Sequence, residues 1–175
     1  MSTDDRAAVE AALRGPAVTP PTRAALLARL NARYDRQYFT PAEFGQLRAA
    51  AVRLVPHDPA ELDLAGLVDD RLHAGRTDGW RYADSLPDGD AYRALLAALP
   101  ADFATLAPGA QDEALRAVQT RLPRAFEDLL AELVEGFVSH PLTSYRFGYA
   151  GFMDAPGWPQ VGPNELEDRE AQYGR

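Results

Sequence analysis

The segment PRAFEDLLAELVEGFVSH, from Pro123 to His140, carries the strongest helical pattern in the sequence and decides the fold class. Its large apolar side chains recur at intervals of three and four residues, so they share one face of a helix. This face consists of Phe126, Leu129, Leu130, Leu133, Val134, Phe137 and Val138. Because Pro141 follows, we expect the helix to end at His140.

The next segment, PLTSYRFGYAGFMDAPGW (residues 141–158), is rich in aromatic side chains but follows neither a helical nor a strand period. Glycines and prolines interrupt it throughout. So many large apolar groups in a surface loop are seldom left exposed to solvent. We therefore expect them to pack either against the chain's own helices or against another protein, and both alternatives stay open.

Two helix starts can be predicted from local chemistry. In TPAE, Thr40 suits the N-cap, Pro41 the first helical position and Glu43 the third, which together form a capping box. Asp63 is predicted to cap the following helix, and Gly75 to close it. No segment alternates with β-branched residues, so no strand is predicted.

These patterns predict an all-α fold, with a single helical domain of about six helices and ordered loops at 76–90 and 141–165. The first helix, over 4–14, buries few apolar residues and is expected to be peripheral. The expected divisions are an N-terminal arm and docking helix (1–37), the helical domain (38–165) and a polar tail (166–175).

Composition excludes several classes of function. The chain of 175 residues contains no cysteine, which rules out disulfides, thiolate catalysis and iron–sulfur clusters. Every one of its 18 basic residues is arginine, so neither a Schiff-base lysine nor a P-loop lysine is present. The net charge of −8 argues against a nucleic-acid partner.

No catalytic or metal-binding pattern stands out. His57, His73 and His140 lie in separate segments without ligand spacing, and His140 is interpreted as a helix C-terminal cap favoured by the dipole. Asp69 and Asp70 are adjacent, so they point to different helix faces and are interpreted as solvated surface rather than a cation site. We therefore predict no catalytic, metal or cofactor-binding residues in this chain.

The first residues, MSTDDRAAVEAALRGPAV, resemble neither a secretory nor a twin-arginine leader. No window approaches the ~20 apolar residues of a membrane helix. The expected location is cytoplasmic, or periplasmic if the chain is exported together with a partner.

Several segments, in this order and spacing, resemble the gluconate 2-dehydrogenase subunit 3 family. The likeness covers about residues 38–165. It rests on YFTPAEFGQLRAAAVRLVPHD, LVDDRLHAGRTDGWRYADSLP, AYRALLAALPADFATLAPGAQDEAL, FEDLLAELVEGFVSHP and GFMDAPGW. Many members of that family carry a twin-arginine leader, which this sequence lacks.

The resemblance implies a small, non-catalytic accessory subunit that stabilises or chaperones a large flavoprotein of the glucose–methanol–choline (GMC) family. That partner would hold FAD and oxidise a sugar, sugar acid or polyol, and a cytochrome c would accept the electrons. Two other interpretations remain open: a stand-alone helical adaptor that binds a different protein, and an enzyme that acts alone.

On the accessory-subunit interpretation, the aromatic tail and the tryptophan loop become the candidate partner-binding surface. Tyrosine, tryptophan, methionine and arginine are enriched in the centres of protein interfaces. The predicted partner-binding residues are Tyr145, Tyr149, Phe152, Met153 and Trp158, followed by Trp80, Tyr82 and Arg146.

Overall fold

A computed structural model describes residues 3–77, 85–149 and 154–155. These residues form eight α-helices and one 3-10 turn without any strand, which confirms the all-α class, whereas the expected number of about six helices was too low. The elements are α1 (Thr3–Arg14), α2 (Pro20–Leu30), α3 (Pro41–Leu54), α4 (Leu64–His73), α5 (Asp88–Ala97), η1 (Phe103–Thr105), α6 (Pro108–Arg121), α7 (Pro123–Val138) and α8 (Pro141–Arg146).

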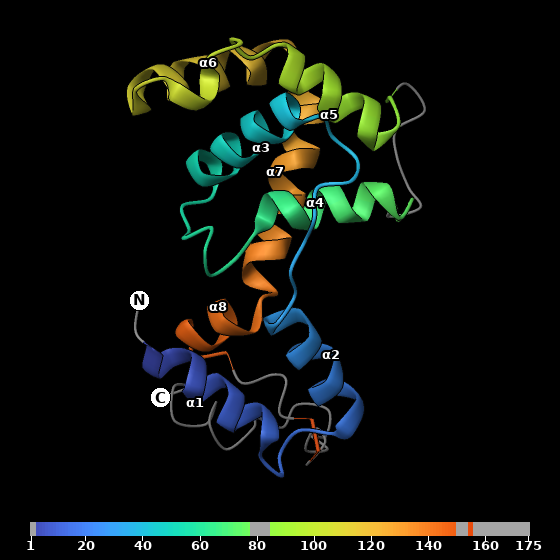
Figure 1. Ribbon diagram of the computed structural model, residues 1–175, viewed down its shortest axis with the longest axis vertical. Coiled ribbons are helices and arrows are strands. Elements are labelled where there is room, and N and C mark those ends of the chain that lie inside the picture. Colours follow the sequence, from blue (N-terminus) through green and yellow to red (C-terminus); the bar gives the residue numbers. More distant parts are fainter. Residues whose placement is uncertain (1–2, 78–84, 150–153, 156–175) are drawn as a thin grey trace, which may run out of the picture.

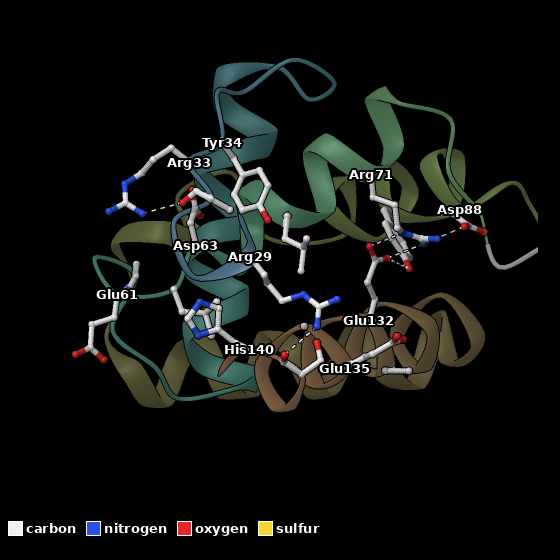
Figure 2. Close-up of a pocket in the computed structure, with 18 of the residues that line it drawn as sticks. Arg29, Arg33, Tyr34, Glu61, Asp63, Arg71, Asp88, Glu132, Glu135 and His140 are labelled. Carbon is white, nitrogen blue, oxygen red and sulfur yellow. Dashed lines mark hydrogen bonds and ion pairs between the residues drawn. The ribbon is translucent and has the colours of Figure 1, made fainter. Parts of the chain in front are cut away.

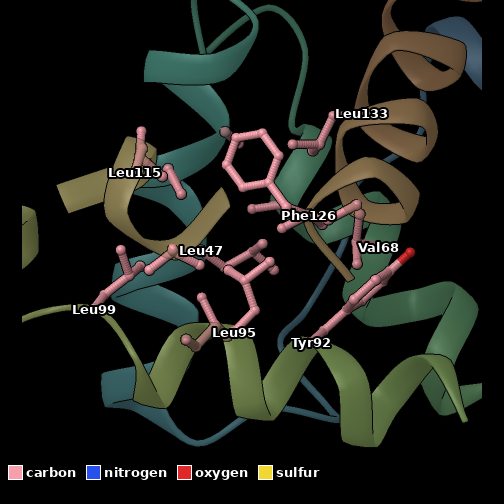
Figure 3. Packing of buried hydrophobic residues seen from close by; sticks show 14 of the residues in the cluster. Leu47, Val68, Tyr92, Leu95, Leu99, Leu115, Phe126 and Leu133 are labelled. Carbon is pink, nitrogen blue, oxygen red and sulfur yellow. The ribbon is translucent and has the colours of Figure 1, made fainter. Parts of the chain in front are cut away.

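The helices form two groups, and α7 runs from one to the other (Figure 1). The larger group contains α3 to α7 and surrounds the main hydrophobic core, to which each of these helices contributes (Figure 3). Fully or almost fully buried examples are Leu47, Val68, Leu95, Leu115 and Leu133. Burying side chains of this size contributes about 2 kcal/mol each.

The smaller group contains α1, α2 and α8, which pack around a second hydrophobic cluster. We expected the first helix to be peripheral because it has few apolar residues. Its Val9 and Leu13 are nevertheless completely buried, against Leu30 of α2 and Leu142 of α8. The N-terminal helices therefore have a core of their own.

Pro141 begins a helix, whereas the sequence predicted that it would end the helical structure. Helix α7 stops at Val138, and Pro141 occupies the first turn of α8, where its missing N–H needs no partner. Leu142 and Ser144 are buried in α8. The prediction of a loop was wrong for residues 141–146, because a helix of 6 residues is too short to show a period.

The predicted helix caps are confirmed. The Thr40 hydroxyl accepts the Glu43 backbone N–H at 3.3 Å, and the Glu43 carboxylate accepts the Thr40 N–H at 2.8 Å, which completes the capping box. Asp63 accepts the backbone N–H of Gly66 at 2.9 Å. Gly75 follows α4 with φ of 63°, a conformation that glycine adopts without strain.

Asp69 is completely buried, which contradicts its interpretation as solvated surface. Its carboxylate accepts hydrogen bonds from three consecutive backbone N–H groups, including Gln37 at 2.5 Å and Phe39 at 2.9 Å. Its neighbour Asp70 is partly exposed, as expected for a surface residue, and it pairs with Arg76. Asp69 thus fixes the segment that leads from the smaller helix group to α3.

We predict that Asp69→Asn lowers the free energy of unfolding by about 2 kcal/mol or more, since an amide places N–H groups against backbone donors. Asp70→Asn is the matched control and should change the same quantity by no more than about 0.5 kcal/mol. Urea denaturation of both variants measures the difference. Equal losses in the two variants would contradict the role given to Asp69.

Candidate functional site

A cleft of about 740 Å³ lies where the two helix groups meet (Figure 2). One side is formed by the end of α2 and the segment after it, including Arg29 and Tyr34. The other side is formed by α4, the start of α5, the part of α7 from Asp128 to Gly136, and Ser139 and His140, which follow the end of α7. Small-molecule sites generally fall between about 300 and 1,000 Å³, so the cleft has a suitable size.

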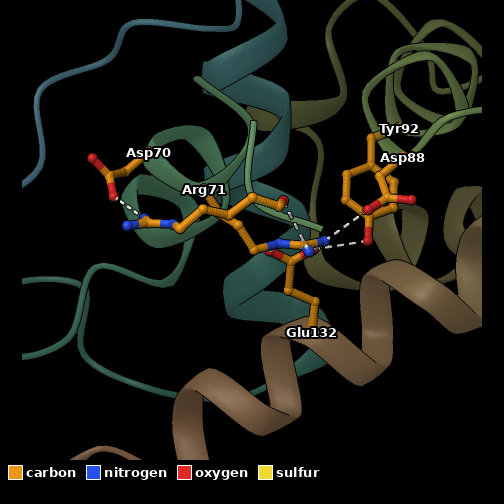
Figure 4. A network of polar contacts seen from close by, with 6 residues as sticks. Asp70, Arg71, Asp88, Tyr92 and Glu132 are labelled. Carbon is orange, nitrogen blue, oxygen red and sulfur yellow. Dashed lines mark hydrogen bonds and ion pairs between the residues drawn. The ribbon is translucent and has the colours of Figure 1, made fainter. Parts of the chain in front are cut away.

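A polar network holds the α4–α7 side of the cleft in place (Figure 4). Arg71 of α4 binds Glu132 of α7 through two bonds, Nε to Oε1 at 2.6 Å and a terminal nitrogen to Oε2 at 2.8 Å. The same guanidinium reaches Asp88 at 3.1 Å, and the Tyr92 hydroxyl donates to Glu132 at 2.8 Å. These four side chains brace helices α4, α5 and α7 against one another.

The network is built for structure rather than for proton transfer. Burial, followed by the adjacent Glu132 carboxylate, raises the pKa of the Tyr92 hydroxyl far above its ordinary value. Tyr92 therefore stays protonated and keeps donating to Glu132. Arg71 and Glu132 form a largely buried, bidentate pair, and removing one partner of such a pair destabilises the protein.

His140 is not the charged C-terminal cap, favoured by the helix dipole, that the sequence predicted. It is only 5% exposed and lies between α7 and α8, where burial first, and then Arg29 and Arg6, lower its pKa to about 4. The ring is therefore neutral at pH 7 and gains nothing from the helix dipole. Its Nδ1 is buried without a hydrogen-bond partner among the described residues.

The other two histidines offer no reactive arrangement. His57 follows α3, and its Nδ1 donates to the Val55 carbonyl at 2.5 Å, as expected for a turn. His73 is the last residue of α4. Within the described ranges, no three His, Cys, Asp or Glu side chains gather as a metal site would require. Nor does any helix there have the length and apolar character to span a membrane.

A separate feature is a set of exposed apolar side chains at the C-terminal end of α7, on α8 and directly after α8. Val134 and Val138 were expected on the buried stripe of α7, but the core covers only the part around Phe126, Leu129 and Leu133, so both valines remain exposed. The Phe147 ring stands edge-on to Phe137, with centroids 6.1 Å apart. We call Val134, Val138, Tyr145, Phe147 and Tyr149 the α7–α8 apolar surface; Phe147 and Tyr149 are 66% and 60% exposed.

The structure brings together only part of the predicted partner-binding set. Tyr145 and Tyr149 lie on the α7–α8 apolar surface, whereas Phe147, Val134 and Val138 were missed. The valines were missed because periodicity shows that residues share a helix face without showing how much of that face is covered. Trp80, Tyr82, Phe152, Met153 and Trp158 lie outside the described residues.

The remaining candidate, Arg146, is engaged within the chain. Its guanidinium binds Glu61 at 2.9 Å and Asp5 at 3.0 Å, so it connects α8 with α1 and with the loop before α4. Asp154 likewise returns to the chain, accepting from the Thr19 N–H and the Thr22 hydroxyl at 2.7 Å each at the start of α2. Arg146, which lies between Tyr145 and Phe147, and Asp154 are thus both bound to other parts of the chain.

Comparisons with protein-family models, with curated proteins and with solved structures find no match. A proposal for function therefore depends on the geometry above and on the sequence resemblance.

We predict that His140 makes folding stability depend on pH between about 6.5 and about 4. The unfolded chain binds a proton at the ordinary pKa of 6.5, whereas the folded chain resists it until about 4. The contribution of His140 to the free energy of unfolding is therefore fully present above pH 6.5. It is lost as the pH falls through this window, and the loss is about 3 kcal/mol at most.

Urea denaturation at a series of pH values measures this loss. His140→Gln cannot titrate, so its stability should decline less steeply across the window than that of the wild type. Parallel declines in the two proteins would show that carboxylates elsewhere, rather than His140, cause the pH dependence.

Proposed function

We propose that this chain is a non-catalytic accessory subunit that binds a larger protein through the α7–α8 apolar surface. The observation that supports this most directly is the exposure of five large apolar side chains within residues 134–149, whereas Leu129, Leu133 and Leu142 of the same helices are buried. Scattered exposed apolar residues are normal, but groups of them mark interaction sites. Aromatic side chains such as Phe147, Tyr145 and Tyr149 are typical of the centre of an interface.

We further propose that the partner is a GMC-type flavoprotein that holds FAD and oxidises a sugar, sugar acid or polyol, with a cytochrome c as electron acceptor. This part rests on the resemblance to the gluconate 2-dehydrogenase subunit 3 family. The absence of cysteine and lysine from the sequence agrees with a chain whose partner supplies the redox chemistry.

The proposed benefit to the partner is stability. A subunit that binds the folded partner and not its unfolded chain stabilises it by mass action, by about 2.7 kcal/mol when its concentration is 100 times the dissociation constant. An accessory subunit can therefore support folding of the flavoprotein without contributing any reactive group.

The experiment is a pull-down of the full chain from its native cell extract, followed by an absorbance spectrum and peptide identification of the co-purified protein. A yellow complex with flavin bands is the expected result. A colourless complex with another protein would show that the partner is not a flavoprotein and would support the adaptor interpretation. Elution of the chain alone would contradict both.

The α7–α8 apolar surface can be tested with a double variant, Val138→Ser with Phe147→Ser. Both side chains are exposed, so the fold should change little, whereas loss of two interface groups should weaken the complex by about 2–3 kcal/mol, or roughly 30- to 150-fold. Binding of the captured partner is measured by calorimetry.

The control is Leu86→Ser, which removes an exposed leucine that lines the cleft and does not belong to the α7–α8 apolar surface. Its affinity for the partner should equal that of the wild type. If Leu86→Ser weakened the complex as much as the double variant, the interface would not be centred on the α7–α8 apolar surface.

A further inference from the structure

The α7–α8 apolar surface and the cleft lie on adjacent sides of helix α7. Val134 and Val138 are on the exposed apolar side, whereas Ala131 and Glu135 line the cleft (Figure 2). Residues three or four positions apart are neighbours on the surface of a helix. Ala131 comes three residues before Val134, and Glu135 comes three residues before Val138. A partner that covers the two valines therefore also reaches the edge of the cleft.

The cleft beside these valines has an excess of negative charge. Seven carboxylate side chains and three arginines line it. One of the arginines, Arg71, is already bound to Glu132 and Asp88. The carboxylates of Glu135 and Asp35 are exposed, and neither has a hydrogen-bond or ion-pair partner within the described residues. The cleft therefore attracts cationic groups and repels anionic ones.

Negative charge also borders the apolar side of α7 at its other end. Glu127 lies seven residues, or about two turns, before Val134, so it is on the same side of the helix. It is exposed and has no side-chain partner in the part of the chain that the structure describes. Arg146, beside the aromatic residues of α8, is already paired with Glu61 and Asp5 and is therefore not available to balance this charge.

The charge pattern indicates what kind of partner fits the α7–α8 apolar surface. The chain carries a net charge of −8, and a symmetric contact between two copies would place the same carboxylates of both chains near each other. Like charges across an interface repel, and an anionic lipid surface would be repelled for the same reason. A positively charged protein surface is attracted instead.

We propose that the partner segment that covers the α7–α8 apolar surface is amphipathic and basic. Its apolar side chains pack on Val138 and Phe147, and its lysine or arginine side chains lie over the cleft edge beside Glu135. This inference rests on the proposed function, because it takes the surface to bind a protein, and it adds the chemistry of the contact. Attraction between opposite charges of this kind speeds association and selects the partner.

Two model peptides with the same apolar face serve as probes. Both are amphipathic helices of leucine and alanine, one with lysine at every polar position and the other with glutamate. We expect the full chain to bind the lysine peptide in calorimetry, and to bind the glutamate peptide at least about tenfold more weakly. Equal binding of the two peptides, or binding of neither, would overturn the proposal.

Charge reversal tests the position of the contact. Glu135→Lys should weaken binding of the lysine peptide by about five- to tenfold, because it replaces an attraction by a repulsion. Glu113→Lys is the matched control: Glu113 is an exposed, unpaired glutamate of α6 that does not line the cleft, as judged within the described ranges. It should change the affinity by no more than about twofold. Equal losses in both variants would indicate general attraction to an acidic protein and refute the contact beside Glu135.

The partner captured from the cell extract separates this inference from the proposed function. Raising the salt concentration from about 0.05 M to about 0.5 M should weaken its complex by about tenfold or more, because salt screens exposed charges. A complex that Val138→Ser with Phe147→Ser weakens, but that neither salt nor Glu135→Lys weakens, would keep the proposed surface and overturn its basic partner.

Two other results would contradict the use of the surface itself. A complex that salt weakens while Val138→Ser with Phe147→Ser does not would place the contact away from the α7–α8 apolar surface. Sedimentation that shows a dimer of the chain, lost in the same double variant, would assign this surface to a second copy. Either result would overturn the basic partner segment proposed here.

Discussion

The Asp69 carboxylate is the contact on which the arrangement of the two helix groups most depends. It is buried, and it binds the consecutive N–H groups of Gln37, Tyr38 and Phe39. A buried carboxylate is unfavourable unless its oxygens are satisfied, so the chain at 37–39 is held in one conformation. That segment leads from α2 to the capped start of α3, and it therefore sets where the smaller group lies relative to the main core.

Helix α7 provides the second connection between the groups and shapes the cleft. Near its C-terminal end it packs closely on α4 at Gly136, where an added Cβ would lie 2.7 Å from the Leu67 side chain. Its C-terminal end passes through His140 into α8, which belongs to the other hydrophobic cluster. Because α7 belongs to the main core and leads directly into α8 of the smaller one, the cleft beside it is bounded by residues that are far apart in sequence.

The cleft and the α7–α8 apolar surface occupy different sides of α7. Glu132, Glu135 and Ser139 face the cleft, whereas Val134 and Val138 lie on the exposed apolar side. The helical spacing of 100° per residue separates these two sets. The cleft and the α7–α8 apolar surface therefore do not overlap on this helix.

The sequence by itself determined the helical class, the capping box at Thr40 and the caps at Asp63 and Gly75, because these depend on neighbours within a few residues. It also singled out Tyr145 and Tyr149, but it left open whether they pack against the chain's own helices or against another protein. Only the tertiary structure decided that Asp69 is buried, that His140 is neutral, and which half of the α7 stripe remains exposed. Each of these depends on what residues distant in the chain place against it, and local patterns do not record such contacts.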